Sequence, residues 1–247
     1  MNIGIYQSAA SLSALERWQD SVTQNISNSQ LPGYRKRSTL FQTEGMGERQ
    51  SIPGSASSGE TVPLLFPKAG NTISFLPGEA QASGRQYDVA IQGAGFFEVQ
   101  TASGQKAYTR DGEFQLQPDN TLTTASGESV LNSGGTPITL LPTGGPLVIN
   151  TDGTLMQGTT SLGKLSIQNF ADTSQLIAAG GGTFLANGAA PTPVAKPELL
   201  QGYLEGSNVS PMHEMVDLIT ISRAYESNQK IISTADQEMQ KTLDALG

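Results

Sequence analysis

The chain has 247 residues, of which 36% are hydrophobic and only 15% charged, and its formal net charge is −8. This length allows a sizeable core, and so few charged residues leave a weakly charged, polar surface that suits an assembly subunit or an extracytoplasmic protein. The negative charge argues against broad nucleic-acid binding, and the absence of cysteine excludes disulfides, thiol nucleophiles and cysteine-ligated metals.

Glycine and proline divide the chain into three parts. Residues 5–32 and 207–246 contain no glycine, whereas residues 33–206 carry 26 of the 28 glycines and 11 of the 13 prolines. Helix interiors disfavour both residue types, and turns between strands need them. The sequence therefore predicts a mainly β protein with an N-terminal helix over 1–32 and a C-terminal helix over 207–247.

The N-terminal helix is predicted to carry a narrow apolar seam. Apolar residues recur with the 3-4 spacing of a coiled coil at Ile5, Leu12, Leu15, Val22 and Ile26. A following Leu-Pro-Gly step at 31–33 should stop the helix. No apolar run approaches the roughly 18 residues of a transmembrane span, and the N-terminus lacks the features of a cleaved signal peptide, so we expect no membrane insertion.

Residues 33–206 divide into a patterned centre with a less patterned stretch on each side. Residues 33–86 should form an extended linker with β segments, and 178–206 a second linker. Residues 87–177 contain short apolar stretches between turn signals, including two strands hinged at Gly93 and Gly95. This spacing predicts a compact antiparallel sheet or small barrel.

The C-terminal helix has a clearer seam. Leu218, Tyr225 and Ile232 are spaced by seven, with Ile221 and Asn228 on the companion positions. Asn228 either fixes the register of a helix pair or lies at the edge of the seam.

The two predicted helices differ in charge. Residues 1–40 have four basic and two acidic side chains, a net of +2, and residues 211–247 have three basic and six acidic ones, a net of −3. Opposite charges favour contact between the termini. We expect the helices to pair as a coiled-coil-like unit that is mobile in a free monomer and ordered in an assembly. The alternative is a monomer whose helices pack on its own β body.

The sequence offers little catalytic chemistry. His213 is the only histidine, which argues against a histidine triad or a histidine metal site. Asp88, Asp111 and Glu113 occupy ordinary strand and turn positions, and the tripeptide that begins at Arg110 is better explained as a turn than as an adhesion motif. We expect no catalytic site, metal or cofactor.

Three blocks of sequence, in order along the chain, carry a more specific signal. They are Asn25–Asn28 followed by Pro32–Arg35; Asp88–Phe97 followed by Tyr108–Phe114; and Gln201–Val209 followed by Glu214–Val216 and Arg223–Glu226. Together they resemble the bacterial flagellar basal-body rod and hook protein family. Features of both the distal rod protein and its proximal-rod paralogue are present.

The resemblance implies a structural subunit that is exported by the flagellar type III apparatus without a cleaved signal. It implies a periplasmic rod in the basal body, a helical homopolymer that transmits torque and contacts neighbouring rod or hook proteins. We assign the intersubunit seam to Leu12, Leu15, Val22, Ile26, Leu218, Ile221, Tyr225 and Ile232. The turn from helix to linker is assigned to Asn25, Asn28, Gly33 and Tyr34, and the return into the C-terminal helix to Asn208 and Val209.

A second interpretation is a secreted monomeric β-domain adhesin or glycan-binding module. Such a module needs an exposed aromatic cluster. Aromatic residues are only 6% of the chain, and its one tryptophan, Trp18, falls within the predicted N-terminal helix.

Overall fold

A computed structural model describes residues 3–49 and 62–245, and the chain divides into two compact units. The helical unit comprises residues 1–27, 37–73 and 210–247, and the β unit comprises residues 28–36 and 74–209. The fold is mainly β with one long helix near each end, as the distribution of glycine and proline predicts.

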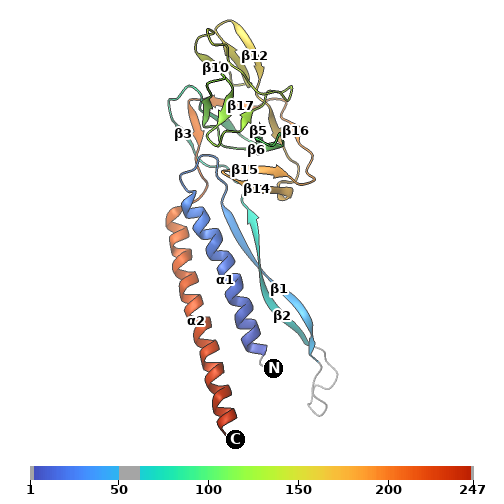
Figure 1. The fold of residues 1–247 in the computed structure, drawn as a ribbon, viewed down its shortest axis with the longest axis vertical. Coiled ribbons are helices and arrows are strands. Elements are labelled where there is room, and N and C mark those ends of the chain that lie inside the picture. The colour runs from blue at the N-terminus through green and yellow to red at the C-terminus, as the bar shows by residue number, and fades with distance from the viewer. Residues whose placement is uncertain (1–2, 50–61, 246–247) are drawn as a thin grey trace. The chain divides into compact units, whose positions relative to one another are not determined.

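The helical unit contains two helices and a two-stranded hairpin (Figure 1). Its elements are α1 (Ile3–Ser27), β1 (Arg37–Arg49), β2 (Val62–Ile73) and α2 (Pro211–Asp244). α2 begins directly after Ser210, and a proline suits the first helical position because no N–H partner is needed there. Glu214 in its first turn and Lys241 in its last turn complement the helix dipole.

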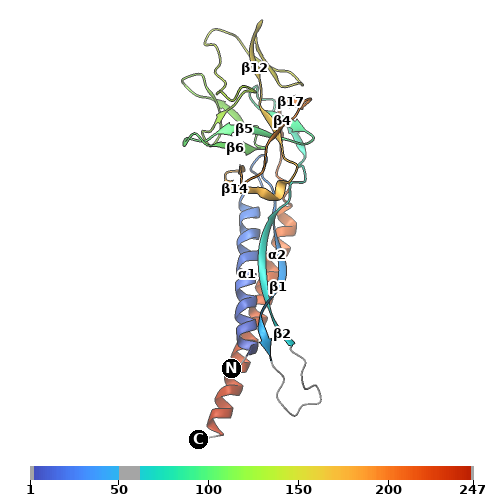
Figure 2. The ribbon, with the colours of Figure 1, turned by 90° about the vertical axis from the view of Figure 1, so that its right-hand side faces the viewer.

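The hairpin packs along α1 (Figure 2). The ring of Trp18 in α1 meets the ring of Phe41 in β1 edge to face, with 5.5 Å between their centroids. Arg17 donates a hydrogen bond from Nη1 to the carbonyl of Ala69 in β2 at 3.4 Å. Because an isolated two-stranded hairpin is only marginally stable in water, contact with α1 supplies the support that β1 and β2 need.

The β unit, all of which the structure describes, is built from short strands and one turn of 3-10 helix, η1 (Thr173–Gln175). The strands are β3 (Ala80–Ala82), β4 (Val89–Gln92), β5 (Phe96–Gln100), β6 (Lys106–Thr109), β7 (Phe114–Leu116), β8 (Leu122–Thr124), β9 (Ser129–Val130), β10 (Leu147–Ile149), β11 (Thr154–Gln157), β12 (Thr160–Lys164), β13 (Ile167–Asn169), β14 (Leu176–Gly180), β15 (Thr183–Ala186), β16 (Thr192–Pro193), β17 (Glu198–Gln201) and β18 (Tyr203–Glu205).

Antiparallel pairing connects these strands. Within the β unit the largest sheet has nine strands in the order β14-β15-β6-β5-β9-β8-β7, with β13 pairing β5 and β16. A three-stranded sheet has the order β10-β11-β12, and two further pairs join β17 to β4 and β18 to β3. The last two pairs bring chain from the C-terminal side of the unit against its N-terminal strands.

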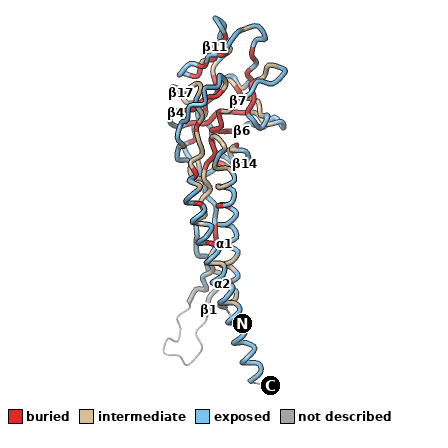
Figure 3. Tube along the Cα trace, turned by 90° about the vertical axis from the view of Figure 1, so that its left-hand side faces the viewer, coloured by how far each residue is buried: buried red, intermediate tan, exposed pale blue. Residues whose placement is uncertain are grey.

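The main hydrophobic core lies in the β unit (Figure 3). Its fully buried side chains come from strands of several sheets and from the segments between them, and include Val89, Phe97, Val99, Leu122, Val130 and Leu155. Aromatic rings add edge-to-face contacts, such as the pair Phe97 and Phe114 with centroids 5.1 Å apart. This core gives the β unit a stable body of its own.

The structure differs in detail from the expected boundaries. α1 ends at Ser27, several residues before the predicted stop at 31–33. Residues 33–86, expected as linker with β segments, contain the β1–β2 hairpin. Residues 178–206, expected as a linker, contain β15 to β18, which pair with β6, β13, β4 and β3. These strands have two to four residues each, too short for an alternating pattern to reveal them.

Candidate assembly site at the terminal helices

The seam residues predicted on α1 lie on a partly buried face of that helix. Leu15 and Val22 are buried, with 9% and 2% of their surface exposed. Leu12 and Ile26 are half-buried. Ile26 packs against the cluster formed by Leu15 and Val22.

The seam residues predicted on α2 are less uniform in burial. Ile221 is only 1% exposed and belongs to the same cluster as Leu15 and Val22. Tyr225 and Ile232 are half-buried, and Leu218 is 38% exposed. Leu218, Ile221 and Tyr225 line a groove of about 440 Å³ that also borders α1. The helical unit therefore has a small core and an open apolar groove.

α2 also exposes apolar side chains outside this cluster. Each is more than half exposed, and they are Met212, Met215, Val216, Ile219, Ile231 and Leu243. Figure 3 shows α2 as largely exposed beyond the cluster. A continuous helix with this much unburied apolar surface is typical of an element that packs against a partner.

Asn25 connects three elements of the helical unit. It is fully buried, and its Nδ2 donates to the carbonyl of Arg37 at 2.8 Å and to Oε2 of Glu214 at 2.9 Å. Its Oδ1 accepts a hydrogen bond from the backbone N–H of Arg37 at 2.8 Å. The amide thus bonds the first residue of β1 as a neighbouring strand would, and it also reaches the first turn of α2.

The segment after α1, residues 28–36, belongs to the β unit. The backbone carbonyl of Asn28 accepts from the N–H of Leu31 at 3.1 Å, which forms the turn after the helix. Gly33 has φ +69°, and a Cβ added there would lie 2.3 Å from the backbone carbon of Arg110. Tyr34 is buried. The position of Gly33 thus needs glycine for both its backbone conformation and its close packing.

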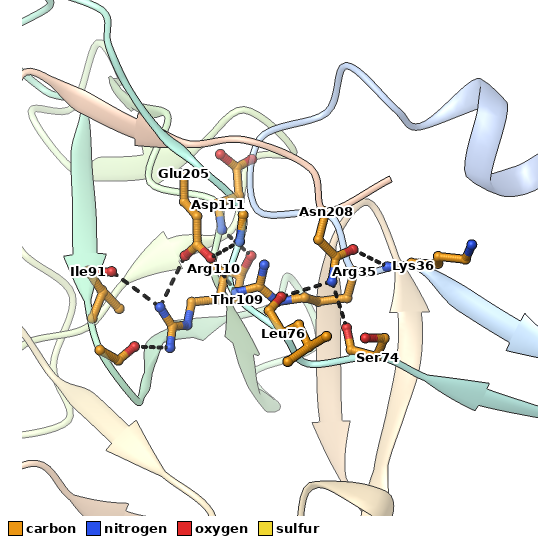
Figure 4. Close-up of polar contacts among 12 residues, drawn as sticks. Arg35, Lys36, Ser74, Leu76, Ile91, Thr109, Arg110, Asp111, Glu205 and Asn208 are labelled. Carbon is orange, nitrogen blue, oxygen red and sulfur yellow. Dashed lines mark hydrogen bonds and ion pairs between the residues drawn. The ribbon is translucent and has the colours of Figure 1, made fainter. Parts of the chain in front are cut away.

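Asn208 plays a similar bridging role within the β unit (Figure 4). Its Oδ1 accepts from the backbone N–H of Lys36 at 2.6 Å, and its Nδ2 donates to the carbonyls of Ser74 at 3.0 Å and Leu76 at 2.8 Å. Val209 is 9% exposed and precedes α2 by two positions. One side chain therefore joins the segment before α2 to two others.

A buried ionic triad next to Asn208 was not predicted from the sequence. Glu205 pairs with Nη2 of Arg35 at 2.5 Å and with Nη1 of Arg110 at 3.0 Å (Figure 4). Burial lowers the pKa of the Arg110 guanidinium, although the Glu205 carboxylate opposes that change. The paired residues are 170 and 95 positions apart, so no local pattern could join them. Their one sequence signal is that each lies within a block that resembles the rod and hook proteins.

Groups that could support chemistry are sparse in the part of the chain that the structure describes. Residues 3–49 and 62–245 contain no cluster of three or more histidine, cysteine, aspartate or glutamate side chains able to hold a metal. Over the same ranges, neither helix combines the length and apolar character that a membrane crossing requires. His213 is exposed at the start of α2. Burial raises the pKa of Asp111 to about 6, and this residue accepts a hydrogen bond from the backbone of Glu113.

Two models of flagellar rod and hook protein domains match segments of this chain. The model described as the C-terminal domain of the flagellar basal body rod proteins FlgE, FlgF and FlgG matches residues 200–245. The model described as the D1 domain of the flagellar hook proteins FlgE, FlgF and FlgG matches residues 90–157. The matched segments contain α2, Glu205, Asn208 and Arg110.

Whole-chain comparisons agree with these matches. The chain is 33% identical to the flagellar basal-body rod protein FlgF of Caulobacter vibrioides, over 100% of this chain and 99% of that protein. It is 30% identical to FlgF of Mesorhizobium japonicum with the same coverage, and 33% identical to the rod protein FlgG of Agrobacterium fabrum over 93% of this chain and 94% of that one. The chain therefore belongs to the flagellar basal-body rod protein family.

Proposed function

We propose that this protein is a structural subunit of the bacterial flagellar basal-body rod and that it acts by assembling with itself and with other rod and hook proteins. Similarity to rod proteins over the whole chain carries this conclusion. It is a binding and load-bearing role, and no enzymatic step is part of it.

We further propose that α1 and α2 form an antiparallel coiled-coil-like pair that is the polymerising element. The buried cluster of Leu15, Val22 and Ile221 supports contact between the helices. The hydrogen bond from Asn25, near the end of α1, to Glu214, near the start of α2, supports the antiparallel direction. The exposed apolar residues of α2 supply the surface that neighbouring subunits would cover.

The small size of the helical core supports ordering on assembly. The helical cluster has three buried members, whereas the β unit contains a core drawn from several sheets. Helices with so little burial are marginal alone, because their stability in proteins comes mainly from packing of an apolar face. A chain with loosely held ends also suits passage through the flagellar type III export apparatus in an unfolded form, followed by folding against neighbours.

The competing adhesin interpretation finds no support. Trp18 packs against Phe41 within the helical unit and is not on the β unit. In the β unit, Phe96, Phe170 and Phe184 are buried and pack against one another. These rings stabilise the body and do not form an exposed platform of the kind that stacks on sugars.

The variant Ile232→Asp tests the seam. A carboxylate on this half-buried position should prevent polymerisation, because charge burial at a helix seam is costly, while the β unit stays folded. Assembly is measured by sedimentation and electron microscopy of the purified chain, and folding of the β unit by near-ultraviolet circular dichroism. The matched control is Ser233→Asp, which adds the same charge at an adjacent exposed residue. Normal assembly of Ile232→Asp would remove α2 from the proposed interface.

A further inference from the structure

Glu205 lies at the meeting point of three chain segments in the β unit (Figure 4). Its carboxylate pairs with Arg35 and Arg110, and its Oε1 also accepts from the backbone N–H of Gly78 at 2.9 Å. Its backbone carbonyl accepts from the N–H of Gly33 at 2.7 Å. A single residue therefore bonds the segment after α1, the segment before β3 and the turn after β6.

The two arginines are held unequally. Arg110 donates from Nη2 to the carbonyl of Gly93 at 2.6 Å and from Nη1 to the carbonyl of Ile91 at 3.3 Å, and its guanidinium lies 5.4 Å from the ring of Phe96. Buried guanidinium nitrogens without a hydrogen-bond partner among the described residues are Nε and Nη1 in Arg35 but only Nε in Arg110. Arg110 is thus fixed by the core of the β unit, whereas the Arg35 guanidinium depends on Glu205.

The triad is also short of negative charge. Two guanidinium groups share one carboxylate, which leaves a net charge of +1 among side chains that are 2%, 3% and 6% exposed. Removing one partner of a buried ion pair is strongly destabilising because it leaves an uncompensated charge. The carboxylate is the one member whose loss leaves both cations unpaired.

We propose that Glu205 is a lock that makes residues 28–36, 74–79 and 203–209 order as one cooperative unit in the free chain. The lock keeps the chain segments that leave and enter the helices attached to the β unit. It is a property of the β unit alone and does not depend on the proposed polymerisation.

The charge count distinguishes the members of the lock. Arg35→Met leaves a neutral pair of Glu205 and Arg110 that keeps its contacts with Ile91 and Gly93, so only the segment 28–36 should loosen. Glu205→Gln raises the buried net charge to +2 and leaves a single neutral amide oxygen in place of the carboxylate that Arg35, Arg110 and the N–H of Gly78 share. Combining the two substitutions returns the net charge to +1, so the second change should partly rescue the first.

Hydrogen exchange with mass spectrometry on the purified full chain tests the lock. In Glu205→Gln, exchange should accelerate at least about tenfold in residues 28–36, 74–79 and 203–209 together, since one lost buried charge pair exceeds 1.4 kcal/mol. In Arg35→Met it should accelerate only in 28–36. The double variant should exchange more slowly than Glu205→Gln in 74–79 and 203–209. The control Glu44→Gln breaks an exposed ion pair with Lys68 and should match the parent chain.

Three results would overturn the lock. The first is acceleration confined to residues 203–209 in Glu205→Gln. The second is an equal effect of Arg35→Met and Glu205→Gln on all three segments. The third is a double variant, Arg35→Met with Glu205→Gln, whose backbone exchanges as fast as in Glu205→Gln alone. This result remains decisive even if Glu205→Gln unfolds the β unit.

Discussion

Asn25 is the most informative position at which to test the proposed pairing of the two helices. The substitution Asn25→Asp keeps the shape of the side chain and replaces its N–H₂ donor by an oxygen. That oxygen would lie where Nδ2 now lies, 2.9 Å from Oε2 of Glu214 and 2.8 Å from the carbonyl of Arg37. Two attractive contacts thereby become repulsive ones in a site where Asn25 is 0% and Glu214 1% exposed.

The size of the effect follows from electrostatics. Two unit charges at this separation repel by about 6 kcal/mol at an effective dielectric constant of about 20. Protonating the new aspartate avoids the repulsion. For an unperturbed aspartate, with a pKa of about 3.9, the free energy of protonation is about 5 kcal/mol at pH 7.5 but only about 1.5 kcal/mol at pH 5. At each pH the variant adopts whichever is less costly, the charge repulsion or the protonation. Helix pairing in the variant should therefore weaken by about 5 kcal/mol at neutral pH and recover as the pH falls.

The assay is the critical concentration for assembly, measured by sedimentation at two pH values. About 5 kcal/mol corresponds to a rise of more than about a thousandfold at pH 7.5, and about 1.5 kcal/mol to a rise of about tenfold at pH 5. The control Gln24→Glu adds a charge at the exposed neighbouring residue. Assembly of Asn25→Asp that equals the control, or that does not change with pH, would refute a contact between Asn25 and Glu214 in the assembled protein.

Two further predictions concern the β unit. Gly33→Ala should destabilise the β unit by more than the roughly 1–2 kcal/mol that a left-handed backbone costs an alanine, because the new Cβ would also lie 2.3 Å from backbone atoms of Arg110 and Asp111. Chemical denaturation measures the loss. The control is Gly84→Ala, because Gly84 has the same φ of +69° and a Cβ there would meet nothing within 4 Å. Asp111 has a pKa raised from 3.8 to about 6, so the folded state binds more protons than the unfolded state between these values, and stability should fall as pH rises through that window by up to about 3 kcal/mol. Asp111→Asn should abolish that decline in thermal unfolding measured from about pH 4 to pH 7, and an unchanged slope would show that Asp111 does not cause it.

The terminal helices could be predicted from sequence because their signal is local. Long runs without glycine and a repeating apolar spacing belong to single segments, and the structure has a helix in each. The sequence also indicates Asn25 and Asn208, because each lies in a block that resembles the rod and hook proteins. What each amide binds could not be known, since their partners Glu214 and Ser74 are 189 and 134 positions away.

The sequence predicts β segments within residues 33–86, but the pairing of β1 with β2 and the later strands could not be predicted, for physical reasons. β2 contains Pro63, Pro67 and Gly70, residues that normally argue against a strand and are tolerated in a ribbon with two edges. The strands of residues 178–206 are stabilised by pairing with distant chain segments and not by their own pattern. The ionic triad follows the same rule, because its three members come together only when the β unit has folded.

Hydrogen exchange of α1 and α2, compared between the free chain and the assembled filament, is the decisive test of whether these helices order on assembly. We expect rapid exchange of residues 3–27 and 211–245 in the free chain, strong protection of the same residues in the filament, and protection of residues 87–170 in both states. Full protection of both helices in the free chain, with no further change on assembly, would contradict this expectation and would make the protein a self-contained monomer.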